Sequence, residues 1–161
     1  YVEPIARLQA GDLRRETVWG DFAEMMPRGQ PGPGDRGFDV TVNWGRTYWG
    51  GAIFCLLADV RIHQHSEGRM GLQTALRAIN ARRDFRHYWD FRETLAIGDE
   101  ATGTSVLIGQ YEDMRLDAKP ADLDALWADL GVRVGDGTVT CDEGASLAAI
   151  RRAIERPAIP T

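Results

Sequence analysis

Apolar residues recur at helical spacing from the start of the chain. Within residues 5–26 they fall three and four positions apart, for example at Val18, Phe22 and Met25. This spacing places side chains on one face of an α-helix. Gly11 and the aspartate after it interrupt the pattern, so we expect two helical pieces in this region.

Residues 27–37 break the helical pattern completely. They contain three prolines and four glycines. Proline fixes φ and removes a hydrogen-bond donor, and glycine is conformationally permissive, so the composition predicts a loop without helix or strand. Long loops in compact domains serve either as surface linkers or as lids over sites. Both interpretations remain open for this loop, and we expect it to be a lid beside an active-site cleft.

The longest predicted helix spans residues 46–67. Asn43 or Thr47 can cap its start, and Gly68 can end it. Its first half is apolar nearly all round, which predicts burial in a core. Its second half, residues 59–67, is polar, and we expect that half to emerge into solvent.

Further helical segments follow at shorter intervals. Leu72, Ala75, Leu76 and Ile79 obey the i, i+3, i+4, i+7 rule and predict one buried stripe. Other helices are expected at residues 86–95, at 99–114 with Leu107, Tyr111 and Met114 buried, at 123–130 between Pro120 and Gly131, and at 142–155 before Pro157.

The one exception to the helical order lies near residues 132–141. Apolar and polar residues alternate there around Asp136-Gly137, which is the signature of a tight β-hairpin turn. The expected fold is therefore mainly α with one small hairpin. We expect residues 1–131 to form a helical part and residues 132–161 to add the hairpin and a last helix packed on the same domain.

Composition and charge exclude several partners. The chain is 43% hydrophobic and 27% charged, as is usual for a folded water-soluble domain, and its formal charge is −5. The basic residues are scattered, and the pairs at 14–15, 82–83 and 151–152 are expected on solvated helix faces, so no nucleic-acid partner is predicted. The longest apolar run, residues 48–58, is too short to cross a bilayer, so no membrane partner is predicted.

The usual catalytic motifs are missing. His63 and His65 are two positions apart on a predicted helix, so they diverge and cannot share an ion, and we expect no metal site in this chain. Surface or helix-end positions are expected for them and for His87. Cys55 lies in an apolar helix, where its thiol stays protonated and inaccessible. The Pro/Gly loop lacks the Lys-Ser/Thr ending of a phosphate-binding loop.

One unusual segment remains, at the entrance to the longest helix. Tyr48 and Trp49 are followed there by the pair Gly50-Gly51. Each glycine costs a helix about 1 kcal/mol relative to alanine, so the pair indicates the close approach of another backbone or of a ligand. A packing crevice with a core tyrosine is the structural alternative to a substrate-binding role for Gly50 and Gly51.

The same segment resembles a known family. From Tyr48 through an apolar helix to Asp59 and Arg61, and on through the glycine-rich turn at 68–71 into a helix with Leu72 and Leu76, the sequence is similar to the glycyl aminopeptidases, a family of gluzincin zinc metallopeptidases. The related aminopeptidase N family has Tyr-Glu-Lys-Gly in the corresponding place. The Trp49-Gly50 found here favours the glycyl aminopeptidase branch.

The resemblance implies an activity and the position of a catalytic group. In this family two His and one Glu hold Zn²⁺, which activates a water molecule for attack on an N-terminal peptide bond. The family's tyrosine hydroxyl stabilises the oxyanion of the tetrahedral intermediate. By motif correspondence that residue is Tyr48, and the partner would be a peptide substrate.

The resemblance also implies that the chain is incomplete. Tyr1-Val2-Glu3-Pro4 resembles the sequence just after the Glu that supplies the third zinc ligand, and no methionine or signal pattern precedes it. We therefore expect a C-terminal helical fragment that is inactive alone, with no cofactor of its own and with zinc bound by the upstream part of a longer parent. The competing hypothesis is a non-catalytic helical scaffold or partner-binding module in which Tyr48 is a core residue.

Overall fold

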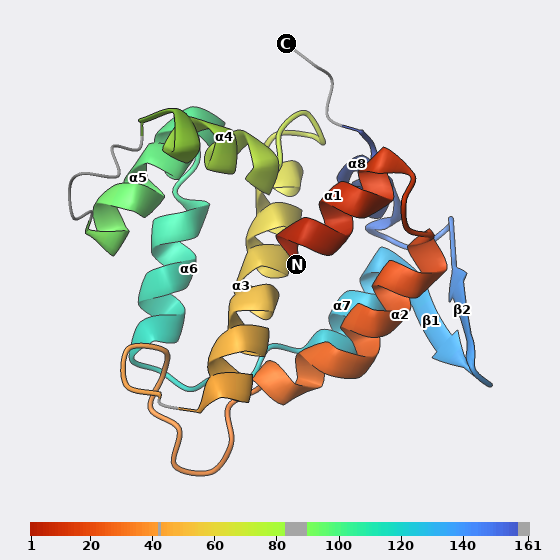
Figure 1. Ribbon diagram of the computed structural model, residues 1–161, viewed down its shortest axis with the longest axis horizontal. Helices are drawn as coiled ribbons and strands as arrows, with labels where there is room; N and C mark the ends of the chain where they lie inside the picture. Colours follow the sequence, from red (N-terminus) through yellow and green to blue (C-terminus); the bar gives the residue numbers. More distant parts are fainter. Residues whose placement is uncertain (42, 83–89, 158–161) are drawn as a thin grey trace.

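The computed structural model describes residues 1–41, 43–82 and 90–157, and those residues form a mainly α-helical fold with one small hairpin (Figure 1). The elements are α1 (Val2–Ala10), α2 (Arg15–Met25), the 3₁₀ helix η1 (Met26–Gly29), α3 (Trp44–His65), α4 (Leu72–Arg82), α5 (Phe91–Thr102), α6 (Val106–Arg115), α7 (Leu123–Leu130), β1 (Val132–Gly135), β2 (Thr138–Cys141) and α8 (Ala148–Glu155). The predicted fold class is confirmed.

The first two helices follow the predicted break. Gly11 closes α1 in the left-handed conformation, with φ of 83°, and its N–H bonds to the Leu8 carbonyl. The expectation of a loop without helix from residue 27 was wrong at its start, because η1 covers Met26–Gly29. Pro27 is compatible with this short helix because it lies in the first turn, where its missing N–H would have no partner.

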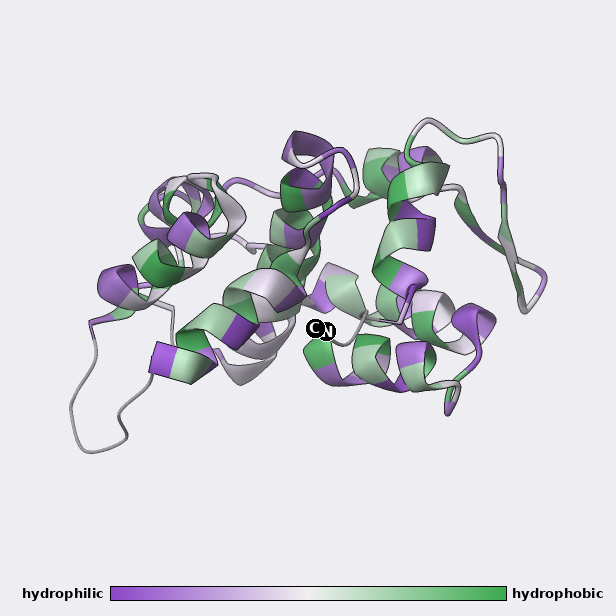
Figure 2. Cartoon of the chain, turned by 90° about the horizontal axis from the view of Figure 1, so that it is seen from above, coloured by the Kyte–Doolittle hydropathy of each residue, from purple (hydrophilic) through white to green (hydrophobic). Residues whose placement is uncertain are grey.

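Helix α3 is the central element, and two hydrophobic clusters share it. In Figure 1 it runs through the middle of the molecule, with α4, α5 and α6 on one side and α1, α2, α7, α8 and the hairpin on the other. Seen from above and coloured by hydropathy, the helices carry hydrophobic and hydrophilic segments in alternation (Figure 2). Each group of helices contributes buried apolar side chains to one of the two clusters, and α3 contributes to both.

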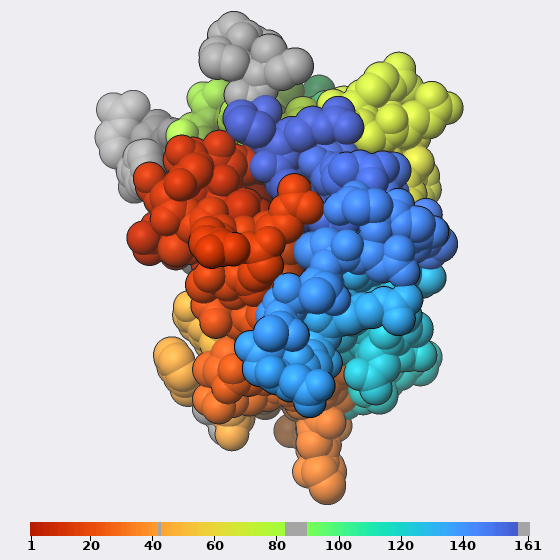
Figure 3. Space-filling model, turned by 90° about the vertical axis from the view of Figure 1, so that its right-hand side faces the viewer, coloured from red at the N-terminus to blue at the C-terminus, as the bar shows by residue number. Residues whose placement is uncertain are grey.

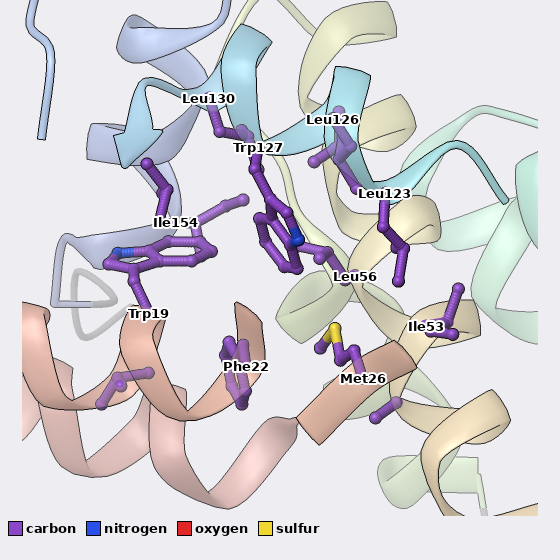
Figure 4. Packing of buried hydrophobic residues seen from close by; sticks show 14 of the residues in the cluster. Trp19, Phe22, Met26, Ile53, Leu56, Leu123, Leu126, Trp127, Leu130 and Ile154 are labelled. Carbon is purple, nitrogen blue, oxygen red and sulfur yellow. The ribbon is translucent and has the colours of Figure 1, made fainter. Parts of the chain in front are cut away.

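The larger cluster joins the N-terminal and C-terminal helices through aromatic side chains (Figure 4). Trp19 is fully buried and meets Trp127 edge to face, with ring centroids 6.5 Å apart. Aromatic pairs of this geometry add about 0.5–1.5 kcal/mol beyond area burial. The other labelled members of the cluster are Phe22, Met26, Ile53, Leu56, Leu123, Leu126, Leu130 and Ile154.

The smaller cluster packs α4, α5 and α6 against the second half of α3. The predicted helix at residues 99–114 is in fact two helices, because Gly103 ends α5 with φ of 64°. Asp99 is buried, and its carboxylate accepts hydrogen bonds from the N–H groups of Leu107 and Ile108 at the start of α6. Leu107 is buried as expected, whereas Tyr111 and Met114 are only partly buried.

The C-terminal part follows the predicted hairpin. β1 and β2 pair antiparallel, with Gly135 opposite Thr138, and Asp136 and Gly137 have the positive φ values that a two-residue turn requires. The last helix starts at Ala148, six residues after the predicted start. In Figure 3 the hairpin and α8, in blue, lie against α1 and α2, in red and orange.

The expectation that the pair at 151–152 is solvated was wrong for Arg151. Its side chain is fully buried, and its guanidinium donates to the Leu130 carbonyl and to the carboxylates of Glu143 and Glu155. Trp19 donates to the same Glu155 oxygen as Arg151 does. This network of hydrogen bonds connects α2, α7 and α8. The spacing of apolar residues could not predict it, because an arginine in a helix is expected at the surface.

Some sequence-based expectations fall outside the described residues. These are the histidine at 87, Arg83 of the second arginine pair, and the first four residues of the predicted helix at residues 86–95. The described part of that segment begins α5 at Phe91, after Asp90 caps the helix by accepting from the N–H groups of Arg92 and Glu93.

Candidate functional site

The first turns of α3 present aromatic side chains to solvent. Asn43 caps the helix, and its side-chain oxygen accepts from the Arg46 N–H at 2.9 Å. Trp44 and Tyr48 lie one turn apart and are 74% and 56% exposed. Their rings stack with centroids 5.1 Å apart and an interplanar angle of 14°. Burial of the first half of the predicted helix, expected from its hydropathy, is therefore wrong for Tyr48.

The Tyr48 hydroxyl is open to a ligand. Among the described residues it has no hydrogen-bond partner, while the ring is held between the Trp44 face and the edge of Trp49, at a centroid distance of 5.2 Å. The ring orientation is therefore supported by two neighbours from the same helix. A phenol held in this way has a fixed body and a free polar tip.

The two glycines after Trp49 have different surroundings. A Cβ at Gly50 would collide with the Arg46 guanidinium and with the Phe38 ring, so this glycine is required by packing within the chain. A Cβ at Gly51 would have no atom within 4 Å. Of the two residues expected to bind substrate, only Gly51 is next to open space.

Gly50 also marks a close backbone approach. A Cβ at Gly29, in η1, would collide with the backbone of Trp49 and Gly50. The sequence-based inference that another backbone or a ligand approaches the glycine pair is therefore correct for the backbone, and that backbone is η1.

Arg46 fastens the Pro/Gly loop to α3. It is 6% exposed, donates to the Asp35 carboxylate and to the Gly29 carbonyl, both at 2.8 Å, and lies 4.5 Å from the centroid of the Phe38 ring. At 100° per residue, Arg46 and Gly50 lie roughly 160° round the helix from Tyr48. The loop is therefore anchored, and it is anchored on the side of α3 that faces away from Tyr48, which does not favour a lid over that residue.

The second half of α3 buries two polar side chains, Asp59 and His63. Asp59 is 4% exposed. One of its oxygens accepts from the Leu72 N–H at 2.7 Å, and the other accepts from the Tyr1 hydroxyl at 2.8 Å. Burial raises the pKa of the Asp59 carboxyl, although both hydrogen bonds counteract the increase. The expectation that this half emerges into solvent was wrong for Asp59 and His63, whereas Arg61, Gln64, His65 and Glu67 are exposed as expected.

The two described histidines differ in burial. His65 is exposed at the helix end, as expected, whereas His63 is 7% exposed, which contradicts the expected surface position. Its Nε2 lies 3.5 Å from an Asp59 oxygen, and its Nδ1 is buried without a hydrogen-bond partner in the described structure. Burial lowers the pKa of the His63 imidazole, and the Asp59 charge opposes that decrease.

The remaining candidate groups offer little chemistry. Burial raises the pKa of the Cys55 thiol, which keeps it protonated, as expected for a cysteine in an apolar helix. Within residues 1–41, 43–82 and 90–157 no group of three His, Cys, Asp or Glu side chains could hold a metal ion. None of the described helices is long and apolar enough to cross a membrane.

The buried and exposed groups share one side of α3. Tyr48, Cys55 and Asp59 are separated by seven and four residues, so on an ideal helix they lie within roughly 40° of one another. Tyr1 bonds to Asp59, and its amino group lies near Cys55. The chain therefore reaches α3 at Tyr1 on the side that carries Tyr48.

Comparisons with known proteins add no assignment. No family model matches the chain, and neither the curated proteins nor the solved structures searched contain a match to it. A functional conclusion must rest on the residues of the site.

Sequence reasoning identified Tyr48 and the glycine pair but missed Arg46, Asp59 and Tyr1. Polar residues near a helix end suggest solvent exposure when only the local sequence is considered. The burial of Asp59 could have been predicted from its position, because it lies seven residues after Ala52 and therefore on the same apolar stripe of α3. An acidic residue on such a stripe indicates a buried acceptor.

Proposed function

We propose that this chain is the C-terminal helical part of a zinc-dependent aminopeptidase of the gluzincin type, and that Tyr48 supplies the hydroxyl that stabilises the transition state. The observation that carries the proposal is the exposed Tyr48, whose ring is held between Trp44 and Trp49 and whose hydroxyl has no hydrogen-bond partner within the part of the chain that the structure describes. A core tyrosine would have a buried ring and a bonded hydroxyl.

The surroundings of Tyr48 suit an extended peptide. Gly51 lies one turn further along the same side of α3 and leaves open space beside the ring. A peptide carbonyl lying there can accept a hydrogen bond from the phenol. When water attacks that carbonyl its oxygen becomes negatively charged, and a donor already in place stabilises this charge more than it stabilises the ground state.

The described residues do not fit a zinc site, since no three ligand side chains converge among them. The proposal therefore assigns the ligands to sequence ahead of Tyr1. Tyr1 lies against α3 on the side that carries Tyr48, and the helical rise between Tyr48 and Asp59, the partner of Tyr1, is about 16 Å. A short segment leading into Tyr1 can reach the Tyr48 hydroxyl, which supports this assignment.

The test is Tyr48→Phe in the longer protein, assayed by hydrolysis of aminoacyl amides. Because the hydrogen bond would form to charge that appears in the transition state, kcat should fall about 10²- to 10³-fold with KM nearly unchanged. The matched control is Tyr111→Phe, since the Tyr111 hydroxyl is bonded to Asp39 on the surface of α6. That variant should keep the parent kcat.

Two outcomes would contradict the proposal. One is full activity of the Tyr48→Phe variant. The other is a longer protein that has no His-Glu-x-x-His motif ahead of Tyr1 and hydrolyses no peptide. That second result would favour the non-catalytic module, for which the exposed Trp44–Tyr48 stack would be a contact surface.

A further inference from the structure

Trp44 is the most exposed large hydrophobic side chain of the described residues, at 74%. Its ring stacks on that of Tyr48, with centroids 5.1 Å apart and an interplanar angle of 14°. The indole is therefore held by a neighbour from the same helix while most of its surface faces solvent. Aromatic side chains gain much free energy when a partner buries them, and tryptophan is common where proteins bind ligands. An indole exposed in this way beside the proposed catalytic tyrosine is suited to contact a substrate.

Trp44, Tyr48 and Gly51 form a strip along one side of α3. At 100° and 1.5 Å per residue they lie within roughly 60° of one another, with a rise of about 6 Å from Trp44 to Tyr48. A Cβ at Gly51 would meet no atom within 4 Å, so the strip stays open beyond Tyr48. An extended peptide advances about 3.4 Å per residue, which places alternate residues about 7 Å apart. A peptide along the strip can therefore present one residue to Tyr48 and another, two positions away, to Trp44.

The two ends of the strip differ. Beyond Gly51, Tyr1 covers the same side of α3, because its hydroxyl bonds to Asp59 and its amino group lies near Cys55. In Figure 1 the start of α1 lies against the later turns of α3, whereas the first turns are open to the viewer. A bound peptide can therefore continue past Trp44 but not past Tyr1. An aminopeptidase requires such an arrangement, since only one residue precedes the bond that it cleaves.

We propose that Trp44 is a specificity-determining residue that contacts the second residue after the scissile bond and favours an aromatic side chain there. The inference rests on the proposed function, because it places the scissile carbonyl at the Tyr48 hydroxyl. With the substrate N-terminus directed toward Tyr1, the second residue after that carbonyl lies about 7 Å further along the strip, at the level of Trp44. An aromatic side chain can stack there on the open surface of the indole.

Trp44 should act on binding and not on the chemical step. Under the proposed arrangement the indole touches neither the scissile carbonyl nor the attacking water. A contact of this kind stabilises the bound substrate and the transition state equally, so it lowers KM and leaves kcat unchanged. The expected signature is the opposite of that of Tyr48, whose hydroxyl should act on kcat.

The test compares two peptide amides in the longer protein, Ala-Ala-Phe-Ala and Ala-Ala-Ala-Ala, each cleaved after its first residue. The parent should have a KM about tenfold lower for the peptide with phenylalanine, at equal kcat. Trp44→Leu should abolish this difference, whereas Trp44→Phe should retain most of it. The ratio between the two peptides is the readout, because a change in the support of the Tyr48 ring alters both rates alike. The matched control is Phe91→Ala, an exposed aromatic residue of α5 whose loss should leave the ratio as in the parent.

The same assay separates the role of Trp44 from the proposed function. Hydrolysis of alanine amide, which has no residue beyond the bond to reach Trp44, tests the catalytic role through Tyr48→Phe. If that substitution lowers kcat while Trp44→Leu keeps the preference for phenylalanine, the proposed function stands and the inference on Trp44 is wrong. A parent without the preference, or a preference that Trp44→Leu removes through kcat instead of KM, would also overturn it. A longer protein that hydrolyses no peptide would overturn both.

Discussion

The first two turns of α3 expose two aromatic side chains, whereas its last two turns bury two polar ones. Trp44 and Tyr48 are largely in solvent, and the Tyr48 hydroxyl has no hydrogen-bond partner among the described residues. Asp59 and His63 are covered by α1 and α4, and Asp59 is fully hydrogen-bonded. The difference separates residues available to a ligand from residues whose polar groups hold helices together. A polar group that already has its partners contributes to stability and is not free for catalysis.

The largest expected effect on stability concerns Arg46, which anchors the Pro/Gly loop to the first turns of α3. Arg46→Met removes one partner of an ion pair whose side chains are 7% and 8% exposed, and it leaves Asp35 uncompensated. Breaking a buried pair in this way costs about 3–5 kcal/mol. Urea denaturation should measure that decrease in the free energy of unfolding.

The control for this prediction is Arg14→Met. Arg14 pairs with Glu16, but its side chain is 84% exposed, so the change should cost less than about 1 kcal/mol. Equal effects of the two substitutions would mean that Arg46 does not anchor the loop to α3.

Substitution of Gly50 and of Gly51 by alanine should change stability in opposite directions. Gly50→Ala places a methyl group against Arg46 and Phe38, and overpacking of this kind costs about 1–3 kcal/mol. Gly51→Ala meets no atom within 4 Å and should raise stability by about 0.5–1 kcal/mol through helix propensity. Thermal denaturation of the two variants checks this pair. Destabilisation by Gly51→Ala would show that the space beside Tyr48 is not open.

The smallest expected effect is on the pH dependence of stability, to which the buried residues Asp59 and His63 contribute. Because the pKa of His63 is lowered, the unfolded chain takes up a proton first as pH falls below about 6.5, and stability decreases. The raised pKa of Asp59 acts in the opposite direction, since the folded chain then takes up a proton first. Asp59→Asn removes the stability that folded Asp59 gains by taking up a proton. It also removes the attraction between the Asp59 carboxylate and the protonated His63 imidazole.

Acidification from pH 7 to pH 5 should therefore cost the Asp59→Asn variant about 1 kcal/mol more than the parent. Urea denaturation at several pH values gives the two slopes. His65→Gln, at an exposed position, should follow the parent. An Asp59→Asn variant with the parent slope would contradict the inferred coupling of Asp59 and His63.

The fold was predictable where spacing and turn residues act locally. The breaks at Gly11 and Gly131 and the hairpin around Asp136 follow from backbone conformations that glycine and turn residues favour. The two helices at 99–114 were not separated, because Gly103 stands in an otherwise helical pattern. Gly103 ends α5 in the left-handed conformation, and the buried Asp99 carboxylate accepts hydrogen bonds from N–H groups at the start of α6.

The candidate site was predictable only in part, because its geometry depends on contacts between elements that are far apart in the sequence. Local hydropathy describes a residue, whereas burial depends on what packs against it. Arg151 and His63 are polar and buried because carboxylates from other turns or elements face them. Tyr48 is aromatic and exposed because α1 and α4 cover only the later turns of α3, near Asp59.

The most direct test of the account compares Tyr48, in α3, with Tyr1, which contacts the same side of α3 through Asp59. Tyr48→Phe and Tyr1→Phe each remove one hydroxyl, and kcat and the free energy of unfolding are measured for both in the longer protein. The account predicts that Tyr48→Phe lowers kcat about 10²- to 10³-fold without changing stability. It predicts that Tyr1→Phe, which loses the bond to Asp59, costs about 1–3 kcal/mol of stability with kcat retained. Loss of stability without loss of kcat in Tyr48→Phe would contradict the account.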